Sequence, residues 1–345
     1  MEPAFMRFVL AISATAMSLL IALQFTSDPP PAMPFKDFTV ALICPNDGNR
    51  NSEVGRAIST ARQAAIANLG CRVVPVFLPA DGELLAQEFR QFAANFPDGI
   101  AIMGYPANDA LLVDIEETLD QDVRVTSFNS RFPAGENQFQ LDGFGFSGSD
   151  GYAAGYRLAR AALAKHNLQP DDTALIIGDL SHSAREDFYN GASAALNEGG
   201  LTVASREVTT YELQMAHQDF VRWLAAEREA GTLPDLICFT EIPIRLAAEA
   251  MERARIKPGS VPLIGLGTEP TLDEIAMKSD HWGRHISLIA SQDIALQAYM
   301  AIVQICLSKS SFTPGLRVDT PVEILGLGRT SPTLKSNEKR FIHLN

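Results

Sequence analysis

Short, almost uninterrupted apolar runs alternate with amphipathic stretches over residues 36–325. Such runs are typical of strands buried on both faces, and apolar positions recurring every three or four residues predict helices. The predicted strands are 39–44, 72–77, 99–103, 123–128, 138–146, 173–177, 201–208, 236–240, 261–266, 286–289 and 322–325. The predicted helices are 54–69, 82–96, 107–119, 152–165, 184–198, 213–229, 244–255, 271–277 and 293–307.

This alternation predicts an α/β fold with parallel sheets covered by helices on both faces. The chain has 345 residues, more than one lobe of about 150 residues needs, so we expect two Rossmann-like lobes. No stretch between the two halves has the composition of a linker, which favours a three-strand hinge with crossings near Ser149, Gln292 and Pro321. The predicted N-terminal lobe comprises 36–149 and 292–320, the C-terminal lobe 150–291 and 321–330, and the tail 331–345.

The N-terminus has the pattern of an export segment. Arg7 precedes an apolar run at 8–25 that contains no charged residue, and a positive residue before such a run is typical of a signal peptide. The run is nearly long enough to span a bilayer, and its small-residue cleavage pattern is weak, so an uncleaved anchor remains open. A proline-rich spacer follows, and we predict residues 1–35 to be signal peptide or anchor plus spacer, with the folded part in the periplasm.

The composition limits which partners and cofactors we expect the chain to bind. The net charge is −13 at pH 7, and an acidic surface repels phosphate backbones, so no nucleic-acid partner is expected. The four cysteines form no CxxC pair, which leaves a zinc or redox site without support. Cys44, Cys71 and Cys238 lie in strand-like runs and Cys306 in a helix-like run. We expect buried thiols, with a Cys44–Cys71 disulfide left open because their strands can be neighbours.

Two motif-like segments do not predict a cofactor. Residues 143–148 fit G-x-G-x-x-G, but they follow the fifth strand rather than opening the first βαβ unit. His281 and His285 are spaced by four, but Gly283 and the strand that follows argue against a helix, so we predict a solvated turn there and no metal. The sequence contains no P-loop and no convincing nucleophile elbow. We therefore predict no cofactor and no enzymatic activity.

In open parallel sheets, ligands bind beyond the carboxyl ends of the strands. Polar side chains that follow the predicted strands are therefore the candidate ligand contacts. They are Asn46, Asn49, Asn51, Ser52, Tyr105, Asn129, Arg131, Ser149, Asp150, Asp179, Ser181, Arg185, Thr210, Tyr211, Glu241, Thr268, Glu269 and Gln292. Carboxylates and amides can pair with adjacent hydroxyls, and aromatic faces cover a sugar ring, so this mixture suits a hydroxyl-rich ligand.

Five segments in this order carry a family resemblance: 98–103 (DGIAIM), 146–155 (FSGSDGYAAG), 191–196 (GASAAL), 234–240 (PDLICFT) and 290–293 (ASQD). Over about residues 36–325 the chain resembles the type 1 periplasmic binding proteins, in the ribose- and galactose-binding branch that supplies ABC transporters. The resemblance implies two lobes that close on a ligand about a hinge.

Carried over by position, the resemblance implies specific ligand contacts. They are Asn129, Asp150, Tyr211, Glu241 and Gln292, with Ser52, Tyr105 and Arg185 at looser matches. Gly267 stands where most sugar-binding members carry an Asp that grips ring hydroxyls. This departure argues against a standard pentose or hexose unless Thr268 or Glu269 substitutes.

The function expected from the resemblance is capture of a small polar ligand, a sugar or sugar-like molecule, and its delivery to an ABC importer. The alternative is a periplasmic sensor that docks on a membrane histidine kinase or chemoreceptor. LacI-type regulators share the implied fold, but they need a DNA-binding helix-turn-helix at the N-terminus, where this chain has an apolar segment.

Overall fold

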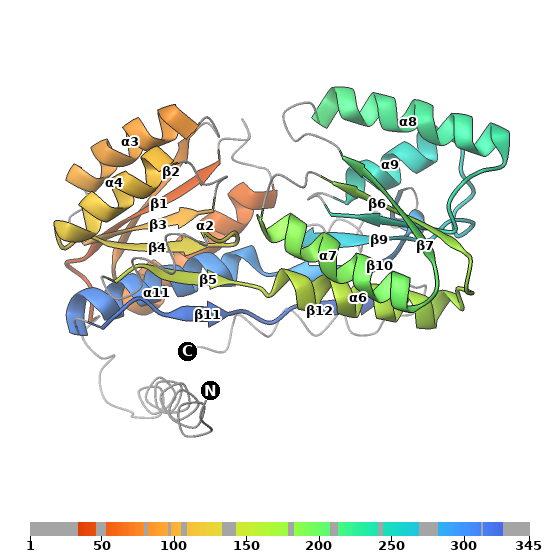
Figure 1. Ribbon diagram of the computed structural model, residues 1–345. Helices are drawn as coiled ribbons and strands as arrows, with labels where there is room; N and C mark the ends of the chain where they lie inside the picture. Colours follow the sequence, from red (N-terminus) through yellow and green to blue (C-terminus); the bar gives the residue numbers. More distant parts are fainter. Residues whose placement is uncertain are drawn as a thin grey trace, which may run out of the picture.

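Two six-stranded sheets, each with helices on both faces, make up the described part of the chain (Figure 1). The computed structural model describes residues 34–45, 53–78, 82–95, 98–104, 109–132, 143–178, 183–207, 213–240, 244–268, 282–311 and 313–326. The predicted α/β class with two largely parallel sheets is confirmed. The expected helix at 271–277 and the first part of the expected strand at 138–146 lie outside the described residues.

The first sheet is parallel throughout, in the order β11-β5-β4-β3-β1-β2. Its strands are β1 (Thr39–Pro45), β2 (Arg72–Leu78), β3 (Gly99–Met103), β4 (Arg124–Phe128), β5 (Gly145–Gly148) and β11 (Arg317–Asp319). One face is covered by α2 (Glu53–Leu69) and α11 (Ile294–Ser311), the other by α3 (Gly82–Asn95) and α4 (Asp109–Asp120).

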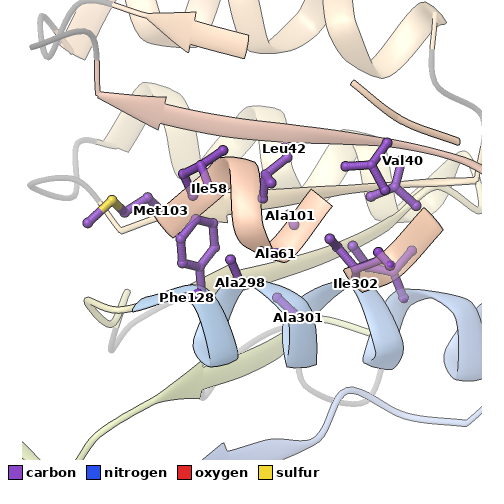
Figure 2. Packing of buried hydrophobic residues seen from close by; sticks show 14 of the residues in the cluster. Val40, Leu42, Ile58, Ala61, Ala101, Met103, Phe128, Ala298, Ala301 and Ile302 are labelled. Atoms are coloured by element: carbon purple, nitrogen blue, oxygen red, sulfur yellow. The ribbon is translucent and has the colours of Figure 1, made fainter. Parts of the chain in front are cut away.

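Alternate residues of β1 enter two different cores. Val40 and Leu42 pack against α2 and α11, whereas Ala41 and Ile43 pack against α3 and α4. All four side chains are fully buried, which is why this strand is apolar at every position instead of alternating. Figure 2 shows the first of these cores, where side chains of β1, β3, β4, α2 and α11 pack together.

The second sheet has the order β12-β10-β9-β8-β6-β7. Its strands are β6 (Thr173–Gly178), β7 (Thr202–Glu207), β8 (Leu236–Phe239), β9 (Leu263–Thr268), β10 (Ile286–Gln292) and β12 (Glu323–Gly326). One face is covered by α6 (Gly151–His166) and α7 (Ser183–Glu198), the other by α8 (Leu213–Ala230) and α9 (Arg245–Arg253).

The chain passes between the sheets three times, from β5 to α6, from β10 to α11 and from β11 to β12 (Figure 1). Strand β11, which the sequence pattern did not predict, pairs with β5, and the Thr320 backbone NH donates to Gly148 O at 2.7 Å. Since β11 runs parallel to β5 and continues directly into β12, β12 enters the second sheet against the direction of β10. This antiparallel edge strand is a departure from the expected all-parallel sheet.

The segment before β10 differs from the predicted solvated turn. Trp282–His285 forms a 3₁₀ helix, η3, that packs against α9. The side chain of His285 is 3% exposed, so the turn is buried at this end. The prediction was wrong because it considered only the local glycine and not the apolar residues that α9 contributes to the adjoining core. His281 lies outside the described residues.

Among the described helices, none is both long and apolar enough to cross a membrane. The apolar segment 8–25 lies outside the described residues.

Candidate functional site

Of the eight predicted contact residues, three have described side chains: Asn129, Asp150 and Gln292. Arg185 lies in the first turn of α7. The others lie outside the described residues, namely Ser52, Tyr105, Tyr211 and Glu241. The three described residues all lie at strand ends where the chain leaves a sheet: Asn129 follows β4, Asp150 follows β5, and Gln292 ends β10.

The structure brings Asn129 and Gln292 into contact, although they are 163 residues apart. Asn129 Nδ2 donates to Gln292 Oε1 at 3.3 Å and to Gln297 Oε1, on α11, at 3.2 Å. We call these three residues the amide cluster. Gln292 and Gln297 are buried, and hydrogen bonds between buried amides are strengthened by the low local dielectric. The cluster therefore joins the end of a first-sheet strand to the crossing that leaves the second sheet.

Asn129 is held by its backbone as well as by its side chain. Its φ of 66° is left-handed, a conformation that Asn tolerates better than most residues. Its NH donates to Ser147 O at 3.0 Å, which ties it to β5. On the other side, a Cβ added to Gly104 would come within 2.1 Å of Ser130 O, so the ends of β3 and β4 approach closely. Both the turn and the amide at position 129 therefore favour Asn.

The cluster determines which chemistry each amide can offer to a ligand. An Asn side chain has two N–H donors and one carbonyl acceptor, and Asn129 uses both donors on the two glutamines. It can then offer only Oδ1, an acceptor. Gln292 uses Oε1 to accept from Asn129, so Nε2 is the group with which it can donate. A hydroxyl group can satisfy this pair by donating to Asn129 and accepting from Gln292.

Gln297 is the residue that the sequence reasoning missed. It is fully buried on α11, and its Nε2 has no hydrogen-bond partner among the described residues. The available signal was a polar residue on the face of α11 that otherwise carries Ile294, Ala298, Ala301 and Ile302. A buried polar side chain on such a face indicates a polar partner inside the fold.

Asp150 caps α6. Its Oδ1 accepts from the Ala153 NH at 2.9 Å, and its own conformation is extended (φ −72°, ψ 100°). Asp293 occupies the equivalent position at α11, where its Oδ1 accepts from the Leu296 NH at 2.8 Å. Burial raises the pKa of Asp293, against the lowering effect of hydrogen bonds from Leu296 and Ala295. Aspartates therefore begin both helices that follow a crossing, since their oxygens satisfy amides of the first turn.

The position of Gly267 has no room for the aspartate that the resemblance implies. A Cβ there would lie 2.5 Å from Ile289 Cγ2, and Ile289 is fully buried. Thr268, one of the two suggested substitutes, is 1% exposed at the end of β9, and Glu269 lies outside the described residues. An aliphatic side chain thus occupies the space next to position 267.

A second buried hydroxyl lies at the same edge of the second sheet. Thr240 follows β8, and its Oγ1 is buried without a hydrogen-bond partner in the described part of the chain. A Cβ on Gly178 would collide with this oxygen, so glycine at the end of β6 leaves space for it. Where side chains are described, no three His, Cys, Asp or Glu residues gather as metal ligands would.

No protein-family model matches the chain, and no curated protein matches it. Solved structures do. A periplasmic solute-binding protein of Actinobacillus succinogenes with bound D-allose superposes with a TM-score of 0.70 at 14% identity, covering 84% of this chain and 97% of its own. The myo-inositol-binding protein of Caulobacter, with myo-inositol bound, gives 0.69 at 16% identity, covering 87% and 96%. A proposed LacI transcriptional regulator of Bacteroides fragilis gives 0.63 at 14% identity, covering 84% and 96%.

At these identities the likeness establishes the fold: the described chain has the architecture of the type 1 periplasmic sugar-binding proteins. The similar solute-binding structures are described as ligand-binding proteins and not as enzymes.

Proposed function

We propose that this chain is an extracytoplasmic solute-binding protein that closes on a small hydroxyl-rich ligand, such as a sugar or cyclic polyol, and delivers it to an ABC importer. The observation that carries the proposal is the amide cluster, which leaves an acceptor on Asn129 and a donor on Gln292 beside the crossings. The bound ligands of the similar structures, D-allose and myo-inositol, belong to the same chemical class.

The proposed mechanism is closure of two lobes about the three crossings. Asn129 follows β4 of the first sheet and Gln292 ends β10 of the second, so a hydroxyl held by both contacts both lobes. A ligand can shift the equilibrium towards the closed arrangement only by the contacts that this arrangement adds. The permease would then distinguish loaded from empty protein by its shape.

The ligand is proposed to be held without the aspartate at position 267. Because Ile289 fills that space, recognition falls to the amides and, in our proposal, to Asp150 and the predicted contacts Ser52, Tyr105, Arg185, Tyr211 and Glu241. A hexose whose binding depends on a carboxylate at position 267 should therefore bind more weakly than a ligand that hydrogen-bonds to amide and hydroxyl side chains of the protein.

The proposed location is the periplasm, with residues 8–25 as a signal peptide or an inner-membrane anchor. Under the alternative role, a sensor that docks on a membrane kinase or chemoreceptor, the same site would bind ligand without supporting uptake. The likeness to a proposed LacI regulator raises a DNA-bound role, which the net charge of −13 disfavours.

A thermal-shift screen tests the binding proposal. The purified protein is heated with D-allose, D-arabinose, D-galactose and myo-inositol, and a specific ligand should raise Tm with its concentration. The rise should shrink in Asn129→Ala and Gln292→Ala. It should persist in Gln121→Ala, which removes an exposed amide that precedes β4, whereas Asn129 follows β4 at its other end. A ligand-dependent rise that is undiminished in both site variants would refute the proposed site.

A further inference from the structure

Helix α11 carries three buried polar side chains along one side, spaced by seven and four residues. They are Gln297, Gln304 and Ser308. The core that α11 shares with α2 is otherwise apolar, and it contains three of the cysteines as free buried thiols, namely Cys44, Cys71 and Cys306. Burying a polar group costs free energy unless the group is hydrogen-bonded, so each of the three polar residues needs a partner inside the fold.

Gln304 holds α11 against the strand β5. Its Nε2 donates to Phe146 O at 2.9 Å, in a buried hydrogen bond between residues 158 positions apart. The other end of the same amide also lies close to the strand, because a Cβ added to Gly145 would come within 2.5 Å of Gln304 Oε1. Glycine at the start of β5 therefore leaves the space into which this side chain fits.

Stability alone does not explain a glutamine at position 304. Its Oε1 is buried and has no hydrogen-bond partner among the described residues, and an unsatisfied buried acceptor is costly. A methionine of similar length would avoid burying that oxygen, although Phe146 O would lose a donor. The bond to Phe146 is therefore kept together with an unpaired oxygen on the same side chain, which indicates a role in placing α11.

A closed path of contacts leads from Gln304 to the candidate site and back to α11. Phe146 is followed by Ser147, whose O accepts from the Asn129 NH at 3.0 Å. Asn129 Nδ2 in turn donates to Gln297 Oε1 at 3.2 Å. Gln297 lies seven residues before Gln304 on the same helix, about 10 Å along its axis. Helix α11 is therefore tied to the edge formed by β4 and β5 at two points, and one of them is the amide cluster.

We propose that Gln304 is a positioning residue of the ligand site, because it holds α11 at the place where Gln297 meets Asn129. This inference rests on the proposed function, in which Asn129 presents Oδ1 to a ligand. The hydrogen bond from Asn129 to Gln297, at 3.2 Å, lies at the long end of the range for N–H···O bonds. A small displacement of α11 would therefore weaken it and change which atoms Asn129 offers to a ligand.

Ser308 provides a matched control on the same side of α11. Its Oγ donates to Thr313 O at 2.7 Å, so this bond ends five residues further along the chain and does not reach β5. Gln304→Met and Ser308→Ala each remove one hydrogen bond that a side chain of α11 donates, but only the first releases a contact with β5. A purely structural role for Gln304 predicts the same outcome in both variants.

The first arm of the test needs no ligand. In purified protein labelled with ¹⁵N in the asparagine side chains, the NMR signal of the Asn129 amide group is assigned by its loss in Asn129→Asp. This signal should shift in Gln304→Met and in a second variant, Gln304→Leu, and it should stay in place in Ser308→Ala. A signal that is unmoved in both Gln304 variants, or that moves equally in Ser308→Ala, overturns the inference.

The second arm measures affinity by isothermal titration calorimetry with a ligand from the screen. Gln304→Met should raise Kd roughly fivefold, in keeping with the weakening of one hydrogen bond, and Ser308→Ala should leave Kd unchanged. In a chain that already carries Gln297→Leu, Gln304→Met should raise Kd no further, since residues that act through one contact are not additive. An unchanged Kd in Gln304→Met, or a full additional rise in the double variant, contradicts positioning through Gln297.

The two arms separate this inference from the proposed function. If no compound in the screen binds, the proposed function fails, whereas a shifted Asn129 signal still supports the positioning of Asn129 by Gln304. If a compound binds and the Asn129 signal does not respond to the Gln304 variants, the proposed function stands and the inference fails.

Discussion

At the scale of single residues, the amide cluster is the most informative feature. Asn129 combines a left-handed backbone with an amide that reaches two glutamines. Gln297 is fully buried, and its Oε1 accepts one of the two N–H donors of Asn129. It can therefore affect ligand binding without contacting the ligand, because it leaves Oδ1 as the group that Asn129 offers to other partners. We regard it as a positioning residue.

Replacing Gln297 with Leu should weaken ligand binding with little loss of stability. The change leaves one Asn129 N–H without its acceptor, but it also removes the unpartnered Gln297 Nε2 from the core. We expect about a tenfold rise in Kd, the equivalent of one hydrogen bond, and a change of less than about 1 kcal/mol in the free energy of unfolding. Isothermal titration calorimetry with a ligand from the screen measures the first, and urea unfolding the second. An unchanged Kd would show that Gln297 does not position Asn129.

Two histidines make stability depend on pH. Burial lowers the pKa of His285 below its ordinary value of 6.5, although the charge of Glu252 acts in the opposite direction. The pKa of His166 is lowered mainly by burial and also by the positive charge of Lys165. Each group therefore binds a proton more readily in the unfolded chain, so its neutral form is favoured by folding. Their contribution is complete above about pH 6.5 and is lost as the pH falls from there towards the folded pKa values.

Urea unfolding at pH 7.5 and 5.5 measures this effect. The loss of stability between the two values should be smaller in His166→Gln/His285→Gln than in the wild type. An equal or larger loss in the double variant would assign the pH dependence to other groups.

At the scale of elements, the crossings and their helix starts determine the geometry of the site. Helices α6 and α7 pack so closely that a Cβ on Gly155 would lie 2.1 Å from Phe188 O, and one on Gly191 2.0 Å from Tyr152 O. This contact holds the N-terminal part of α6, which Asp150 caps, against α7. Asp150 therefore has a structural role as a cap, whatever its role towards a ligand.

A pair of substitutions separates these two roles of Asp150. Asp150→Ala removes the acceptor for the Ala153 NH and should cost about 1 kcal/mol of stability, whereas Asp150→Asn keeps a capping oxygen and should cost only a few tenths. If Asp150 also binds ligand through its charge, both variants lose affinity. Affinity that falls only in Asp150→Ala would exclude a role of the Asp150 charge in ligand binding. Thermal melts measure the stability of each variant, and isothermal titration calorimetry measures its ligand affinity.

At the scale of the whole molecule, the three crossings connect two sheets that each have their own cores. Few backbone hydrogen bonds need to change when lobes of this kind rotate about such crossings, because the strands within each sheet stay paired. The amide cluster spans the crossing from β10 to α11, and the Asn129 NH bonds to Ser147 O in β5, just before the crossing to α6. We therefore expect a ligand at this cluster to influence the relative position of the lobes.

Ligand should make the molecule more compact. Small-angle X-ray scattering of the purified protein should give a smaller radius of gyration when a ligand from the screen is saturating. Gln292→Ala should need a higher ligand concentration for the same change, because it removes one of the two contacts that bridge the lobes. A radius of gyration that does not respond to saturating ligand would contradict closure as the mechanism.

The order of most helices and strands can be predicted from the sequence alone, because the spacing of apolar residues in each segment reflects which of its sides are buried. Val40 to Ile43 are apolar at every position since both faces of β1 are covered, and this pattern predicts a buried strand in a parallel sheet. The same pattern fixes where each strand ends, and polar residues that follow the strands, such as Asn129 and Gln292, are therefore candidate ligand contacts.

Contacts between distant segments were decided only by the tertiary structure. The pairing of Asn129 with Gln297 and the filling of the space at Gly267 by Ile289 both depend on how helices and strands pack together. The same holds for β11, whose short, exposed segment has no apolar pattern and becomes a strand by pairing with β5. Local periodicity records which side of a segment is buried, but it contains no information on which distant residue covers that side.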